Sequence, residues 1–160
     1  MASESDQIQD DRRGLVWQLA GHGYVGALCH GSPQDLVFES LADWVQFKGL
    51  EIAGLFIEDH RGGFDAARSD CLRNLSESLG APVVVLTHSP LMRGAVAAAR
   101  WLGQEVYAFR LEGLEEAFEE LAVPEAARPG IRAALHALRL ARKLGGGHRR
   151  RSSDSHPQSI

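Results

Sequence analysis

The sequence predicts an α/β fold in which helices pack against a mixed β-sheet. The first observation is the alternation of strand and helix signals between residues 81 and 123. Val83–Thr87 is a continuous apolar, β-branched run, typical of a strand that is buried on both faces. Apolar residues at helical spacing follow at Leu91–Leu102, and the pattern repeats with a strand at Glu105–Phe109 and a helix at Leu114–Leu121. This alternation indicates parallel strands joined by crossover helices.

The second observation is a hairpin signal before this alternation. Leu15–Ala20 and Tyr24–His30 are short strand-like segments, and the loop Gly21-His22-Gly23 separates them. Ser32-Pro33 supplies an N-cap residue and a proline at the first helical position, so a helix is expected from there to Gly49. The inner face of this helix is predicted to comprise Leu36, Val37, Ser40, Leu41, Trp44 and Val45.

A third strand and a second helix connect the two halves. The strand is predicted at Ile52–Ile57, and Gly62-Gly63 then turns the chain into a helix that ends before Gly80 and Pro82. The apolar face of this helix contains Phe64, Ala67, Cys71, Leu72, Leu75 and Leu79. The expected order of elements is therefore β-β-α-β-α-β-α-β-α, followed by a basic C-terminal helix.

Composition divides the chain into four parts. The polar, acidic residues 1–13 are expected to be disordered, and residues 14–123 are expected to form the domain. Residues 124–144 are interpreted as a linker and a basic helix, with the helix at Ile131–Leu144. Residues 145–160 contain too few apolar side chains to fold and are expected to be a disordered tail. On this interpretation residues 1–127 fold without the helix.

The charge is distributed unevenly along the chain. Residues 1–127 carry a net charge of −11, whereas residues 128–160 carry +7. The polar, acidic composition of residues 1–13 predicts no signal peptide there, and no apolar run reaches the roughly 20 residues that span a bilayer. Two cysteines without a CxxC spacing fit a reducing compartment. We therefore expect a cytoplasmic protein without integral membrane association, and no metal or cofactor is expected.

The basic helix is the first candidate for partner binding. It carries an apolar stripe beside its arginines, which include Arg139 and Arg142. Such a helix suits an acidic protein partner, an anionic lipid or a nucleic acid. Nucleic acid is disfavoured because no aromatic residue accompanies the charges and the rest of the chain is acidic. The alternative is that the stripe packs on the domain and the arginines meet its acidic surface. The stripe consists of Ile131, Ala134, Leu135, Leu138 and Ala141.

Four charged residues follow the third predicted strand: Glu58, Asp59, His60 and Arg61. Ligand sites in α/β sheets lie at the carboxyl ends of the strands, so this cluster is a candidate for metal binding or proton transfer. Consecutive side chains point in alternate directions, which opposes their convergence on one ligand. We therefore interpret them as solvated loop charges, with an enzyme site as the weaker alternative.

A second candidate ligand site lies at the start of the helix after the strand Val83–Thr87. Ser89 and Arg93 are placed there, where free backbone N–H groups and the helix dipole favour an anion. Ser89 has a hydroxyl and Arg93 a bidentate fork for phosphate or carboxylate. The alternative is that Ser89 only caps the helix and Arg93 pairs with a surface acid.

Several sequence features resemble the STAS fold, the sulfate-transporter and anti-sigma-factor-antagonist superfamily, in its bacterial STAS-like branch. The features are the element order over residues 15–123 and the turn from Thr87 to Gly94 (THSPLMRG). Trp101 and the strand Val106-Tyr107-Ala108-Phe109 follow, and Leu114–Val123 matches the closing helix. The resemblance implies a regulatory signalling protein that acts by protein–protein interaction rather than by catalysis. It also implies that the loop with Glu58, Asp59, His60 and Arg61 forms part of the partner-recognition surface.

The same resemblance implies a phosphorylation site. In partner-switching members a serine after the third strand is phosphorylated to control binding to a kinase. The matching window here is Arg68-Ser69-Asp70-Cys71-Leu72, in which Ser69 and Leu72 agree with the family pattern and the other three residues depart from it. Ser69 is therefore the candidate phosphorylation site. The alternative function is a module that binds a small anion, nucleotide or lipid at Ser89 and Arg93.

Overall fold

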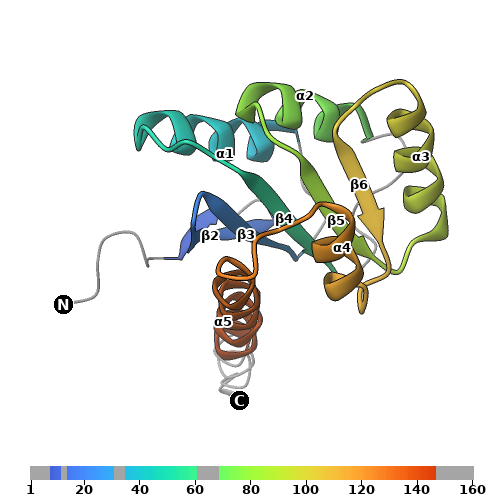
Figure 1. Cartoon of the computed structure of the whole chain (residues 1–160). Coiled ribbons are helices and arrows are strands. Elements are labelled where there is room, and N and C mark those ends of the chain that lie inside the picture. Colours follow the sequence, from blue (N-terminus) through green and yellow to red (C-terminus); the bar gives the residue numbers. More distant parts are fainter. Residues whose placement is uncertain (1–7, 12–13, 31–34, 61–68, 147–160) are drawn as a thin grey trace, which may run out of the picture.

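The computed structural model describes residues 8–11, 14–30, 35–60 and 69–146, and these form an α/β fold around one mixed sheet (Figure 1). The strands lie in the sheet in the order in which they occur in the chain. The first and second strands pair antiparallel, as do the second and third, and the third to the sixth strands are parallel. The strands are β1 (Gln9–Asp11), β2 (Leu15–Gly21), β3 (Tyr24–Cys29), β4 (Gly54–Asp59), β5 (Val83–Thr87) and β6 (Val106–Phe109). The predicted α/β class with a mixed sheet is confirmed.

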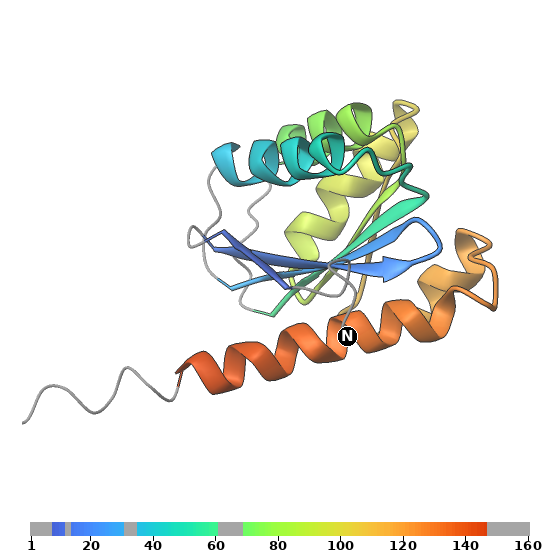
Figure 2. The same cartoon turned by 90° about the vertical axis from the view of Figure 1, so that its left-hand side faces the viewer.

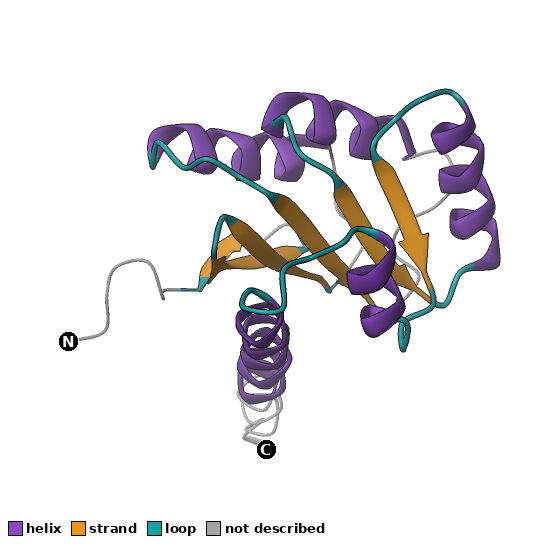
Figure 3. Ribbon diagram, viewed as in Figure 1, coloured by secondary structure: helices purple, strands orange, loops and turns teal. Residues whose placement is uncertain are grey.

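Helices cover both faces of the sheet (Figures 2 and 3). Three of them join the parallel strands, and because right-handed crossovers between consecutive strands fall on one side, all three pack on the same face. The two C-terminal helices cover the other face. The helices are α1 (Asp35–Phe47), α2 (Ser69–Leu79), α3 (Pro90–Trp101), α4 (Leu114–Glu120) and α5 (Arg128–Gly146). Among the described helices, none is long and apolar enough to cross a membrane.

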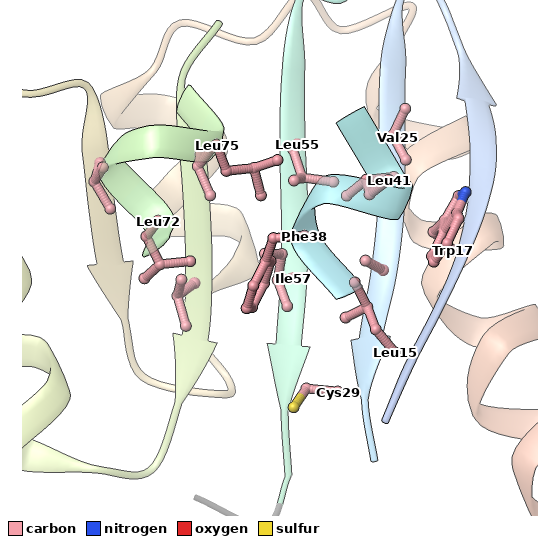
Figure 4. Packing of buried hydrophobic residues seen from close by; sticks show 14 of the residues in the cluster. Leu15, Trp17, Val25, Cys29, Phe38, Leu41, Leu55, Ile57, Leu72 and Leu75 are labelled. Carbon is pink, nitrogen blue, oxygen red and sulfur yellow. The ribbon is translucent and has the colours of Figure 1, made fainter. Parts of the chain in front are cut away.

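The first core lies between the sheet and helices α1 to α3 (Figure 4). Leu55 and Ile57 of β4 point into it, because alternate residues of a strand face the same side. They meet Phe38 and Leu41 from α1 and Leu72 from α2, all buried. The strand β5 is buried at all five positions, which confirms the prediction that both of its faces are covered.

The second core lies between the sheet and helices α4 and α5. Phe56 of β4 packs edge-on against Phe118 of α4, with ring centroids 5.6 Å apart. Ile131 and Leu135 of α5 complete this core and are fully buried, as is Leu138 on the same stripe. The apolar stripe of the basic helix therefore packs on the domain, which is the alternative interpretation of this helix.

Two further expectations are corrected. Residues 1–13 were expected to be disordered, but Gln9–Asp11 form β1 and pair with Leu15–Trp17. Backbone hydrogen bonds of an edge strand do not require apolar side chains, so the polar segment gave no strand signal. The predicted third strand, Ile52–Ile57, is displaced to Gly54–Asp59 and therefore includes two carboxylates. The hairpin loop Gly21-His22-Gly23 is confirmed, and all three residues have positive φ.

Gly130 lies where α5 comes close to the backbone of β2. A Cβ built on Gly130 would collide with the backbone carbonyl oxygen of Ala20. We expect Gly130→Ala to lower the free energy of unfolding by about 1–3 kcal/mol, because the helix must move off the strand. Gly94→Ala is the matched control, since a Cβ there meets no atom within 4 Å. That change should stabilise the protein by about 0.8–1 kcal/mol through helix propensity, and urea titration of both variants measures the difference.

Candidate functional site

The candidate site lies at the carboxyl edge of the parallel strands. The ends of β3, β4 and β5 are in register, so that Cys29, Asp59 and Thr87 are neighbours across the sheet. All three side chains are fully buried. Parallel sheets place their ligand and contact surfaces at this edge. The strand-end cluster predicted from the sequence is therefore located at the edge where α/β folds commonly bind ligands.

Asp59 is connected to the start of α3 by hydrogen bonds. Thr87 Oγ1 donates to Asp59 Oδ2 at 3.3 Å, and the Ser89 backbone N–H donates to Thr87 Oγ1 at 3.1 Å. Ser89 Oγ in turn accepts from the Met92 backbone N–H at 3.2 Å. Ser89 is thus the N-cap of α3, and its hydroxyl oxygen is engaged with the helix itself. This chain of contacts fixes the loop between β5 and α3 against a buried carboxylate.

Glu58 faces the opposite side of the sheet, toward α5. Its carboxylate is nearly inaccessible, with 5% of the residue exposed. His60 Nε2 lies 2.9 Å from Glu58 Oε2, and Arg139 Nε lies 3.0 Å from the same oxygen. Glu58 and Asp59 are therefore buried strand residues, and their interpretation as solvated loop charges is wrong. Burial is tolerated because Glu58 is paired with a cation from another element.

The contact between Glu58 and Arg139 is an ion pair rather than a directed hydrogen bond. Among the described residues, Arg139 Nε has no hydrogen-bond partner with suitable angles, although the distance to the carboxylate is short. The side chains of Arg139 and His60 are both partly exposed at the surface. Arg142 follows Arg139 by about one helical turn and is half-buried. The site thus combines a buried anion with basic groups that reach the solvent.

The arginines in the first half of α5 form hydrogen bonds with residues of the same domain. Arg132 donates two hydrogen bonds to the Glu115 carboxylate, at 2.7 and 2.9 Å, and this contact lowers the pKa of Glu115. Arg128 donates to Glu119 at 2.8 Å and to the Val123 carbonyl at 3.0 Å. These pairs hold α4 and α5 together. The arginines at the start of α5 therefore pair with acidic surface residues of the same chain.

The remaining predicted residues are not brought into this cluster. Arg93 is half-buried on α3, and its Nε atom is inaccessible and has no hydrogen-bond partner in the described part of the chain. Ser69 is the first residue of α2. Arg61 lies outside the described residues. The structure therefore joins Glu58, His60 and Arg139, and it separates them from Asp59, which faces the other layer.

Two features of the site could not be found from the sequence. Thr87 was not among the candidate site residues, although its hydroxyl links Asp59 to α3. The pairing of Glu58 with Arg139 joins segments far apart in the chain, and the only signal was that Arg139 directly follows Leu138 of the apolar stripe. Among the described residues, no group of three or more His, Cys, Asp or Glu side chains is placed to hold a metal ion.

Replacing Arg139 should show how much its charge contributes to the stability of the fold. We expect Arg139→Met to lower the free energy of unfolding by about 1–3 kcal/mol, because it leaves the buried Glu58 carboxylate without its cation. Combining it with Glu58→Leu should recover most of this loss, since the uncompensated charge is then absent. Urea titration of the two single variants and the double variant measures the coupling. Additive losses would show that the pair does not interact.

Comparison with protein-family models, curated proteins and solved structures finds no match to this chain.

Proposed function

We propose that this chain is a non-enzymatic regulatory module of STAS-like type, which acts by binding another protein at the carboxyl edge of its sheet. The observation that carries the proposal is the convergence of two segments at Glu58. The strand-end cluster and the basic helix were each a candidate partner contact, and His60 and Arg139 lie within 3.0 Å of the same carboxylate oxygen. Two separate candidates thus belong to one surface.

The chemistry of this surface favours an acidic partner. The buried carboxylate of Glu58 contacts the Arg139 guanidinium and the His60 imidazole. Arg142 lies about one turn after Arg139 on the same helix. Arg139 and His60 keep part of their side chains in solvent, so they remain accessible to a second anionic group. A carboxylate of a partner protein could pair with the exposed parts of Arg139 and His60.

Rigidity of the surface supports a role in recognition. Glu58 and Asp59 are held in β4, and Arg139 is held by a helix whose apolar stripe lies in the second core. A contact surface built on regular elements loses little conformational entropy when a partner binds. Under the STAS-like proposal, Ser69 at the start of α2 would be the regulated position, where a phosphate adds negative charge.

The proposal is tested by capture of a partner from a lysate of the native host on immobilised full-length protein. We expect one stoichiometric partner that is retained by wild type and lost with His60→Ala combined with Arg142→Ala. Capture should weaken as the salt concentration rises, because partly exposed charge pairs are screened. Arg100→Ala is the matched control: Arg100 is a partly exposed arginine that pairs with Glu120 near the β6 edge, and its loss should leave capture unchanged.

Equal capture by the double variant and wild type would refute the carboxyl-edge surface. Loss of capture in the Arg100 control would also contradict it, because the effect would then be one of general charge. Circular dichroism of each variant establishes that the fold is retained.

A small-anion site at Arg93 is the second candidate function. The observation in its favour is that Arg93 Nε has no hydrogen-bond partner among the described residues, while the Ser89 hydroxyl still has a proton to donate. Under this alternative, phosphate raises the melting temperature of wild type but not that of Arg93→Ala.

A further inference from the structure

The exposed large apolar side chains of the described residues gather at α3. Leu91 is 78% exposed, Trp101 93% and Leu102, directly after the helix, 81%. The other exposed side chains of this kind among the described residues are scattered over three separate places, at Ile8, Phe47 and Leu140. An exposed apolar group of this size on a folded protein marks an interaction surface. None of these residues belongs to the carboxyl-edge site.

The residues at α3 form one continuous stripe along the helix. Met92 and Val96 are buried on the inner side, so the outer side is the one that carries Leu91, Gly94, Ala98, Trp101 and Leu102. We call these five residues the α3 stripe. It contains no charged residue. Its large side chains lie at its two ends and its small ones in the middle, where a Cβ on Gly94 would meet no atom within 4 Å.

We propose that the α3 stripe is the interface between two copies of this chain, with the two α3 helices packed antiparallel about a twofold axis. A twofold interface uses the same patch on both subunits, so the patch must fit itself. Reversing the helix places Leu91 of one copy beside Leu102 of the other. The backbones then cross near Gly94 and Ala98, whose small side chains allow close approach.

The charges beside the stripe are compatible with this arrangement. On the flank next to α2, a cleft of about 630 Å³ is lined by residues that include Arg73, Glu77 and Leu102. The Arg73 guanidinium lies 3.8 Å from the Asp70 carboxylate of the same helix, so its charge is paired within the chain.

The basic residue on the other flank is turned away from the stripe. Arg100 stacks on the Tyr107 ring, 4.2 Å from its centroid, and its Nη1 donates to Glu120 at 2.7 Å. Its charge is thus paired with Glu120 and does not repel a second copy. The neutral stripe is also the place where two chains of net charge −4 can approach with least repulsion.

The expected area indicates a reversible dimer. A tryptophan contributes about 150–250 Å² on burial, and the two leucines and the small residues bring the total for both copies to roughly 1,000 Å². This area is at the lower limit for a specific interface. Association is therefore expected at micromolar to submillimolar concentrations. The proposal is independent of the partner surface at Glu58.

Sedimentation equilibrium of the full-length chain between about 5 and 500 μM tests the dimer. We expect wild type to change from monomer to dimer over this range, and Trp101→Glu to shift the midpoint at least tenfold higher. Phe47→Glu is the matched control, because Phe47 is 87% exposed at the end of α1 and lies off the stripe. This control should dimerise like wild type.

A pair of variants, each with one introduced cysteine, tests the orientation. Leu91→Cys and Leu102→Cys, mixed and oxidised, should form the mixed disulfide, because the antiparallel arrangement places these two positions side by side. A monomer at all concentrations overturns the proposal, and so does a dimer that Trp101→Glu leaves unchanged or that Phe47→Glu removes. Disulfides between two Leu91→Cys chains or two Leu102→Cys chains in place of the mixed disulfide would exclude the antiparallel arrangement. Far-ultraviolet circular dichroism of each variant confirms that only folded chains are compared.

Discussion

Deletion of residues 128–160 is expected to abolish cooperative folding of the remaining chain. The deletion removes α5 and exposes the face of the sheet that carries Phe56, Val84 and Leu86, all fully buried in the intact protein. Burial of each large apolar side chain contributes about 1.5–3 kcal/mol, so Ile131, Leu135 and Leu138 together contribute roughly 5–9 kcal/mol. This is comparable with the whole stability of a typical domain, about 5–15 kcal/mol.

Thermal and urea denaturation of the truncated chain, followed by circular dichroism, measure this effect. Deletion of residues 147–160 alone is the control, because it leaves the buried stripe of α5 intact and should keep the melting temperature. Leu135→Ala provides a milder version and should cost about 2–5 kcal/mol. A cooperative transition in the 1–127 chain close to that of wild type would show that α5 is an appended helix after all.

Replacement of Val84 or Val85 by aspartate is the second change with a large expected effect. The two valines are neighbours in the central strand β5, but Val84 lies in the core under α4 and α5, whereas Val85 lies in the core under α1 to α3. Each aspartate would be an unpaired charge in a dry environment. We expect each variant to lose several kcal/mol, at least about 3–5, and to be mainly unfolded at room temperature.

Ala97→Asp is the control for these two variants, because Ala97 is exposed on α3 and lies outside the α3 stripe. It should remain folded with a melting temperature near that of wild type. Soluble and cooperatively folded Val84→Asp would show that the second layer does not cover the sheet. The same result for Val85→Asp would show this for the first layer.

The sequence predicted the regular elements well where local signals are strong. The run Val83–Thr87 has no polar residue before its last position, and the structure has a strand with these same limits. Ser89-Pro90 combines an N-cap with a helix-compatible proline, and α3 begins there. Such signals depend on residues near each other in the chain, so a sequence is sufficient to find them.

The features that could not be predicted from the sequence depend on contacts between segments that are far apart in the chain. The stripe of α5 suits either a partner groove or the domain itself, and only the position of Phe56 and Leu86 on the uncovered face decides between them. Glu58 looked like a loop charge because carboxylates are rarely buried. It is buried here because Arg139, from the last helix, lies 3.0 Å away.

The central claim is that the end of β4 and the flank of α5 form one surface for an acidic protein partner. Its most direct test is photo-crosslinking of the full-length chain with benzoylphenylalanine in place of His60 or in place of His136, which is exposed one turn before Arg139. The same crosslinker in place of Asp43, exposed on α1, is the control. We predict that one partner is crosslinked from both positions 60 and 136 and not from position 43. A partner that is crosslinked from position 43 alone, or from only one of the two positions at the carboxyl edge, would contradict the claim.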